Sequence, residues 1–262
     1  MAVVRSHPVS RSFSYWWIRH RSHWLRSLLA SVAAPVVYLV VMGQVLGTYV
    51  DGGGPSAQLG GLRYVEFVGP AMVAASAMLL AVTETAFPVF SAFRSERTYT
   101  AQFATPLRPV DILGGHLLWA GVRVAGVAAL LAVAVALMGA AQPASLPAIV
   151  AVAVLTGLAF STWTAAFAAR QRNDGALLAV QRFVTTPMLL FCGVFFPLSQ
   201  LPPPLQAVAA ATPLWHGVAW SRDLANGQAT LASSALHGTY LVAVALAGFA
   251  VARRRYEREL VT

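Results

Sequence analysis

The sequence predicts an all-α integral membrane protein with six transmembrane helices. Hydrophobic residues make up 58% of its 262 residues and charged residues only 10%, whereas soluble domains carry roughly 25% charged residues. Six apolar stretches each reach or approach the roughly 20 residues that a helix needs to cross a bilayer. They cover residues 28–50, 67–93, 112–137, 146–169, 177–196 and 232–252. We therefore expect one membrane domain over residues 1–262, with no room for a soluble catalytic domain.

The charged residues predict the orientation of these spans. All 18 basic residues are arginines. If the N-terminus is cytoplasmic, Arg63 and Arg222 fall outside, Arg123 lies within a span, and the other fifteen fall inside. The positive-inside rule then predicts cytoplasmic N- and C-termini. The net charge of +9 follows from this topology and from contact with membrane lipids, so no nucleic-acid partner is expected. The Ala- and Arg-rich, lysine-free composition favours a high-GC bacterium, and we expect the protein in the bacterial inner membrane.

Residues 10–27 precede the first span and have an aromatic face. Phe13, Trp16, Trp17, His20 and Trp24 follow one another at helical spacing, with arginines mostly off that face. This pattern predicts a helix lying in the membrane interface. A plain aromatic belt before the span is the alternative.

Residues 94–108 form the longest cytoplasmic connection. Ser95 can cap a short helix that begins at Glu96. Pro106 stops this helix, and Pro109 with Asp111 starts the next element. A short helix parallel to the membrane, with Arg97, Thr98 and Gln102 exposed, suits the docking of a soluble partner. An ordinary polar loop is the alternative.

Glu84 and Arg123 stand out as charged residues deep within spans. They lie at similar depths, roughly 15 and 18 Å from the cytoplasmic boundaries, and intramembrane charges usually face the bundle interior and pair. Two interpretations stay open: an internal clamp between the second and third spans, or a polar contact along a substrate route.

Residues 197–223 predict a re-entrant hairpin on the extracellular side. The preceding apolar run breaks at Pro197 and at Pro202-Pro203-Pro204, and a short amphipathic segment then ends near Pro213. A membrane helix that stops at prolines must satisfy its freed backbone groups against protein. The bulky residues around it either pack the hairpin or, with methionines of the first two spans, line an apolar path. The candidate path residues are Met42, Met72, Phe191, Phe195 and Phe196.

Two of these segments resemble ABC-2-type permeases, which are the membrane subunits of ATP-driven exporters, including the nodulation-factor and daunorubicin-resistance types. The resemblance rests on the run FFPLSQLPPPLQ with the later PLWHGV and Arg222, and on Glu96-Arg97 followed by Ala104-Thr105-Pro106-Leu107 and Arg108. Tyr99-Thr100 departs from the family, which more often has a glycine there.

The resemblance implies a partner and a mechanism. The 94–108 segment would be the coupling helix that fits a groove on a separate ATPase, through Glu96, Arg97, Thr98, Gln102, Thr105, Pro106 and Leu107. Two permease copies, identical or paralogous, would work with two ATPase subunits that bind ATP and Mg²⁺. An amphipathic substrate such as a lipid, glycolipid or hydrophobic drug would leave the cytoplasm or inner leaflet.

Other functions lack support in the sequence. A standard P-loop needs a lysine, which this chain does not contain. We therefore expect no nucleotide bound by the chain itself. The histidines are scattered without partners for a metal, and no catalytic residues are expected. An ATP-independent channel or assembly protein remains the alternative, and a membrane-embedded enzyme is a more distant one.

Overall fold

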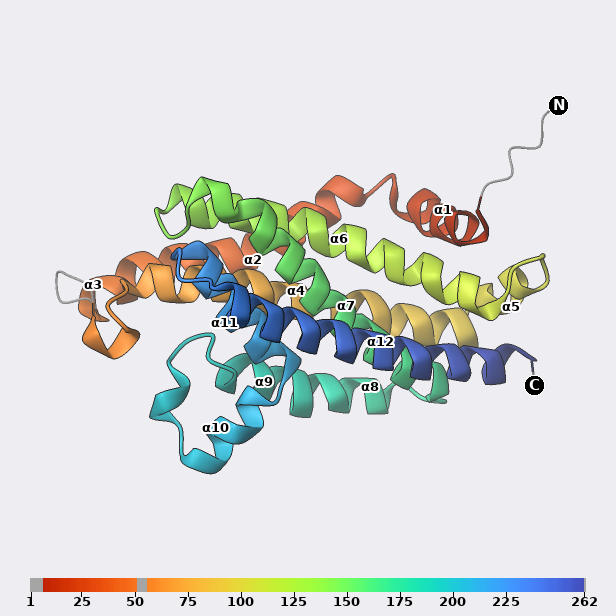
Figure 1. The fold of residues 1–262 in the computed structure, drawn as a ribbon. Helices are drawn as coiled ribbons and strands as arrows, with labels where there is room; N and C mark the ends of the chain where they lie inside the picture. Colours follow the sequence, from red (N-terminus) through yellow and green to blue (C-terminus); the bar gives the residue numbers. More distant parts are fainter. Residues whose placement is uncertain (1–6, 51–55, 262) are drawn as a thin grey trace.

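A computed structural model describes residues 7–50 and 56–261, and every named element in these ranges is helical (Figure 1). Five of these helices are long and apolar enough to cross a membrane. They are Trp24–Gly43, α4 (Tyr64–Arg94), α6 (Pro109–Leu137), Pro143–Arg170 and α12 (Leu231–Val261). The first comprises α2 (Trp24–Val40) and the start of its continuation. The fourth comprises the 3₁₀ turn η3 (Pro143–Ser145) and α7 (Leu146–Arg170). The expectation of an all-α protein with several apolar spans is confirmed.

The expected span at 177–196 is a shorter helix than the other five. It consists of α8 (Gly175–Val180), the π-helical turn η4 (Gln181–Thr185) and α9 (Thr186–Phe191). It ends early because the chain turns at Gly193, whose φ of 80° lies in the left-handed region that a residue with a side chain adopts only at a cost. The described chain therefore has five long apolar helices and one short one, and a count of six full spans stays a prediction.

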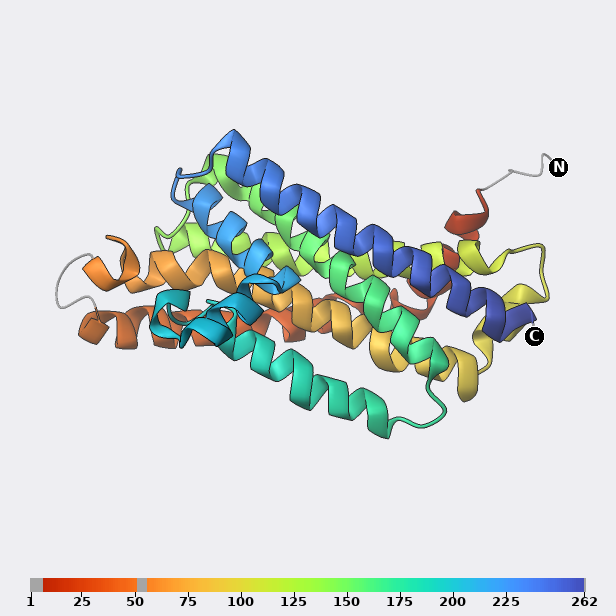
Figure 2. The same cartoon turned by 60° about the horizontal axis from the view of Figure 1, so that its bottom comes forward.

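Helix α4 forms the centre of the bundle. It packs against α6, α7 and α11 (Pro213–Ala225), and α12 lies along the far side of α7 (Figure 2). Its buried face is rich in small residues, including Ala71, Ala74 and Ala75. Small side chains let neighbouring membrane helices approach closely. In the best apolar window of α4, 89% of the residues are buried.

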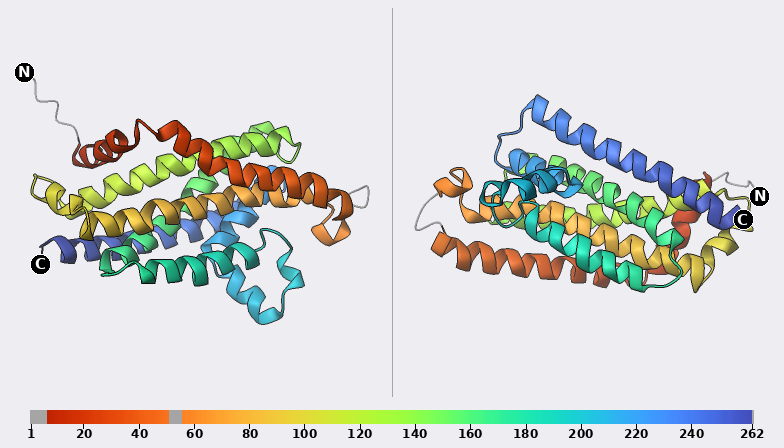
Figure 3. Two further views of the ribbon diagram at one scale, coloured as in Figure 1. Left: turned by 180° about the vertical axis from the view of Figure 1, so that it is seen from behind. Right: turned by 90° about the horizontal axis from the view of Figure 1, so that it is seen from below.

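Helix α2 lies at the edge of the bundle (Figure 3). Only 6% of its apolar window is buried, and it continues through a second π-helical turn, η1 (Val41–Leu46), into α3 (Gly47–Val50). The α8–α9 helix also exposes large apolar side chains, such as Leu178 and Phe183. These two helices leave apolar surface that lipid or another chain must cover.

The N-terminal segment forms two helices where the sequence predicted one over residues 10–27. Helix α1 (Pro8–His20) ends before a three-residue turn, and α2 begins at Trp24. Helix α1 packs along α6, where a Cβ added to Gly115 would come within 2.7 Å of the Phe13 backbone nitrogen. Its aromatic face is therefore partly covered by protein: Trp16 is buried, while Trp17 remains exposed.

The expected hairpin at 197–223 forms a 3₁₀ turn η5 (Leu198–Gln200) and two helices, α10 (Pro203–Ala210) and α11. Arg222 fixes this segment, because its Nη2 donates to the Gly193 carbonyl at 2.7 Å and its Nε donates to the Phe67 carbonyl at 3.0 Å. The guanidinium also lies 3.7 Å from the Phe67 ring centre. A re-entrant path through a membrane stays a prediction.

Candidate functional site

The expected coupling segment lies at the end of the bundle that also carries α1 and the last turns of α12 (Figure 1). Its short helix, α5 (Thr98–Phe103), begins two residues later than predicted. Ser95 does not cap it, because α4 runs to Arg94 and both Ser95 and Glu96 donate their N–H groups to the Ser91 carbonyl. Pro109 and Asp111 start α6 as predicted, and the Asp111 carboxylate accepts from the Arg108 N–H at 3.0 Å.

Arg97 makes the sharp turn between α4 and α5. Its φ of 52° is the one positive value among the described non-glycine residues, and such a conformation is uncommon for a residue with a long side chain. The side chain is exposed and makes no hydrogen bond or ion pair with the described residues. Strained backbone is often retained where it positions a functional group. The turn leaves this guanidinium exposed at the bundle end.

A groove of about 470 Å³ separates α5 from α1. Thr98 and Gln102, expected to be exposed, are half-buried along this groove, because Gln102 Oε1 accepts from Ser12 Oγ at 2.9 Å. Thr98 Oγ1 and Gln102 Nε2 are buried and lack a hydrogen-bond partner within residues 7–50 and 56–261. Unsatisfied buried polar groups are costly. Both atoms are closed to solvent in this conformation, so an added partner could satisfy them only after the side chains turn toward the groove.

Of the remaining predicted coupling residues, some are exposed at the surface and others are buried or hold neighbouring helices together. Thr105 and Pro106 are exposed at the groove edge, whereas Leu107 is buried. Glu96 forms a bidentate ion pair with Arg19 of α1. The Arg19 guanidinium lowers the pKa of the Glu96 carboxyl below its usual value. Glu96 therefore ties α1 to the end of α4.

Beneath α5, Tyr99 connects the helix to α6. The Tyr99 hydroxyl contacts Nδ1 of His116, and His116 Nε2 lies 2.8 Å from the Glu84 carbonyl. A carbonyl only accepts, so Nε2 carries the proton and Nδ1 accepts from Tyr99. The Glu84 carbonyl is free because Pro88, four residues on, has no N–H to donate within α4. Burial raises the pKa of the Tyr99 hydroxyl well above its usual value.

The structure brings Glu84 and Arg123 together. Arg123 Nε lies 3.1 Å from Glu84 Oε1, Trp119 Nε1 donates to Glu84 Oε2 at 3.2 Å, and Arg123 Nη2 donates to Ser27 Oγ of α2 at 2.7 Å. Both charged side chains are largely buried. The pair therefore links α4, α6 and α2.

Sequence reasoning missed four members of this set: Tyr99, His116, Trp119 and Ser27. A signal existed for His116, since it lies seven residues before Arg123 and hence on the same face of α6, opposite the carbonyl that Pro88 frees. Ser27 carried no signal, because its contact depends on how α2 is rotated against α6.

The predicted path residues differ in how far they are exposed. Met42, Met72 and Phe195 belong to one apolar cluster, in which Met72 is buried and Phe195 packs against Tyr38 of α2, with ring centres 5.3 Å apart. Phe191 is exposed and Phe196 is half-buried. A path through Met72 therefore requires a conformation other than this one.

The chain is similar to known proteins over most of its length. A family model described as ABC-2 type transporter matches residues 12–225. Nodulation protein J of Rhizobium leguminosarum bv. viciae is 32% identical over 250 residues, covering 92% of this chain and 94% of that protein. The protein of the same name from Rhizobium meliloti (strain 1021) is 31% identical over 249 residues, covering 94% and 92%. Nodulation protein J of Rhizobium leguminosarum bv. trifolii is 34% identical over 215 residues, covering 80% of each chain.

Proposed function

Because this chain belongs to the ABC-2 type transporter family as a multi-pass membrane subunit, we propose that it is the permease of an ATP-driven exporter of amphipathic molecules. A separate ATPase would bind ATP and Mg²⁺ and dock on the bundle end that carries α1 and α5. This end would face the cytoplasm of a bacterial cell, consistent with its many arginines.

The groove between α1 and α5 is the observation that carries the proposal. It is lined by Thr98 and Gln102, each with one polar atom that lacks a partner among the described residues, and the exposed Arg97 directly precedes Thr98 in the chain. A docked helix or loop of the ATPase would supply acceptors for Arg97 and Gln102 and cover the exposed Thr105 and Pro106. Hydrogen bonds that replace unsatisfied groups stabilise a complex more than bonds that replace hydrated ones.

Contacts beneath α5 support a route by which ATPase movement reaches the membrane helices. Tyr99 contacts His116, His116 contacts the Glu84 carbonyl, and Arg123 joins Glu84 to Ser27 of α2. On this basis Glu84 and Arg123 act as an internal clamp that moves with α5.

The exposed faces of α2 and the α8–α9 helix support the proposal that a second permease copy, identical or paralogous, packs against this chain. Both faces are apolar and poorly covered, and each helix contains a π-helical turn, a feature found often at functional sites. The central path would form between the two copies, from Met42, Phe191, Phe195 and Phe196, with Met72 contributing after rearrangement. Its apolar lining suits a lipid, a glycolipid or a hydrophobic drug.

Co-purification tests the docking site. The variant Ala101→Trp fills the groove from an exposed position on α5, and Arg97→Gly removes the guanidinium while easing the backbone. We expect a P-loop ATPase to co-purify with the wild-type chain and to be lost with Ala101→Trp. The matched control is Arg254→Ala on the exposed surface of α12, which should retain the ATPase.

Two results would count against the proposal. Retention of the ATPase by both Ala101→Trp and Arg97→Gly would place docking elsewhere. A homo-oligomer that never co-purifies with a nucleotide-binding protein would favour an ATP-independent channel or assembly protein.

A further inference from the structure

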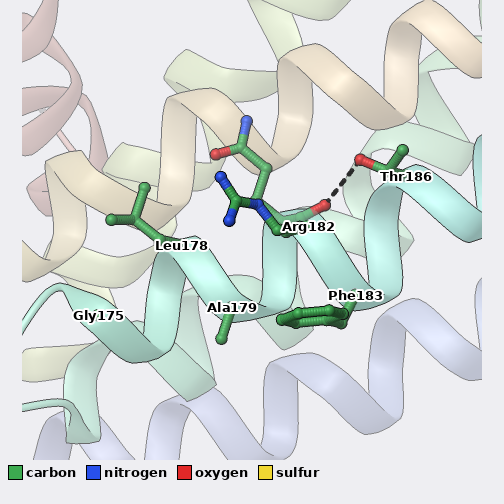
Figure 4. A pocket seen from close by; sticks show the side chains of 7 residues that line it. Gly175, Leu178, Ala179, Arg182, Phe183 and Thr186 are labelled. Atoms are coloured by element: carbon green, nitrogen blue, oxygen red, sulfur yellow. Dashed lines mark hydrogen bonds between the residues drawn. The ribbon is translucent and has the colours of Figure 1, made fainter.

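The exposed face of the α8–η4 helix contains one arginine in an apolar setting. Arg182 lies about 10 Å, or two turns, past the helix start at Gly175, where the sequence alone assigned it to the cytoplasmic side. Its side chain is exposed and makes no hydrogen bond or ion pair with any residue of 7–50 or 56–261. Arg182 borders a hollow of about 550 Å³ with Leu178, Phe183 and Thr186 (Figure 4).

The π-helical turn shapes this hollow. The Gln181 carbonyl accepts from both the Thr186 N–H and Thr186 Oγ1, the latter at 3.1 Å, so the backbone of the turn is satisfied locally. The Gln181 side chain is exposed next to Arg182 and has no hydrogen-bond partner among the described residues. The hollow therefore combines two unused side-chain donors with a large apolar surface, since Phe183 is 73% exposed.

If the α8–α9 helix enters the membrane at its start, a guanidinium two turns in is costly unless it pairs or reaches the head groups. An arginine in the hydrocarbon region costs at least about 2.5 kcal/mol on insertion scales, and such residues usually pair or line a polar route. A carboxylate of a second copy is a poor candidate, because six of the described acidic residues already form ion pairs. The other two are Asp174, in the turn before α8, and Asp223, half-buried in α11.

We infer that Arg182 and Gln181 bind the anionic head group of an amphiphile whose apolar part lies against Leu178 and Phe183. A guanidinium matches the planar geometry of a phosphate or carboxylate and can donate two hydrogen bonds to it. The inference rests on the proposed function for its biological role and narrows the cargo to acidic amphiphiles. The same chemistry could belong to a resident membrane lipid, which the experiment below distinguishes from cargo.

Binding is tested by native mass spectrometry on the full-length chain in a neutral detergent. The probes are phosphatidylglycerol, which is anionic, and phosphatidylcholine with the same acyl chains. We expect the wild-type chain to bind phosphatidylglycerol at least tenfold more tightly than phosphatidylcholine. Arg182→Gln should abolish this preference, and Arg182→Lys should retain part of it. The control Arg172→Gln removes the same charge from the exposed turn before α8 and should leave the preference intact.

Three results would overturn the inference: an undiminished preference in Arg182→Gln, an equal loss in Arg172→Gln, or a change of oligomeric mass in Arg182→Gln, which would place the arginine in a contact between copies. Fluorescent phosphatidylglycerol in proteoliposomes containing the permease–ATPase complex separates the sources. ATP-dependent movement that Arg182→Gln abolishes identifies cargo, and binding without movement identifies a resident lipid. Because binding needs no ATPase, failure of this site and failure of the proposed exporter function are distinguishable.

Discussion

Replacing Arg123 by leucine should destabilise the bundle more than most single substitutions. Arg123 is 5% exposed and donates to Glu84 at 3.1 Å and to Ser27 at 2.7 Å. Leucine would leave the Glu84 carboxylate with one side-chain donor, Trp119 Nε1 at 3.2 Å. Removing one member of a buried ion pair costs about 3–5 kcal/mol, because the remaining charge stays buried without compensation.

Thermal unfolding in a mild detergent, followed by circular dichroism, measures this loss. By the scaling of globular domains, Arg123→Leu should lower Tm by roughly 10 °C. Arg123→Glu should lower it further, because two carboxylates would then share the site. The double variant Glu84→Gln with Arg123→Leu should recover part of the loss, since no unpaired charge remains. Wild-type Tm values in both single variants would refute the clamp.

Three further substitutions or conditions test other contacts. Gly115→Ala should displace α1 and lower stability, since its Cβ would meet the α1 backbone at 2.7 Å; limited proteolysis of α1 would report this. Arg222→Leu should loosen the turn at Gly193, leaving its carbonyl unpaired at a cost of about 1–3 kcal/mol, measured as a lower Tm. Acidification should weaken the Arg19–Glu96 ion pair. Because the pKa of the Glu96 carboxyl is lowered in the folded chain, the pair stabilises the fold at neutral pH. This contribution is lost as the pH falls from 4.5 through the lowered pKa.

Each of these tests has a matched control. Gly114→Ala lies beside Gly115, but its nearest contacts are side-chain atoms at 3.5 Å, so it should leave α1 in place. Arg222→Lys keeps the charge and should fall between wild type and Arg222→Leu. Glu96→Gln should make proteolysis of α1 less sensitive to pH below 4.5. Unchanged pH sensitivity in Glu96→Gln would assign the effect to another carboxylate.

The long helices were predictable because the mean hydropathy of twenty residues depends little on any single residue. The predicted span 67–93 lies within Tyr64–Arg94, and the capping residues at Pro109 fixed the start of α6. The start of α5 was not predictable in the same way. Ser95 has a high preference for N-caps, but here it is the C-cap of α4, with its N–H bonded to the Ser91 carbonyl.

The candidate site was predictable to a similar degree. Similar depth predicted that Glu84 and Arg123 could meet, since depth follows from residue counts. Depth does not predict rotation about a helix axis, so the contact with Ser27 and the burial of Gln102 against α1 depended on packing. The short span at 175–191 was overestimated because apolar residues continue past Gly193 although the helix does not.

Ser27→Ala separates two routes by which movement at α5 could reach α2. One route passes through α1, which Glu96 holds through Arg19 and which a short turn joins to α2. The other passes through Arg123 to Ser27. Ser27→Ala cuts the second route while keeping the Glu84–Arg123 pair, so the free energy of unfolding should fall by only about 1 kcal/mol. If that route transmits the movement, ATP-driven export should fall several-fold while the ATPase still co-purifies; unchanged export would assign transmission to α1.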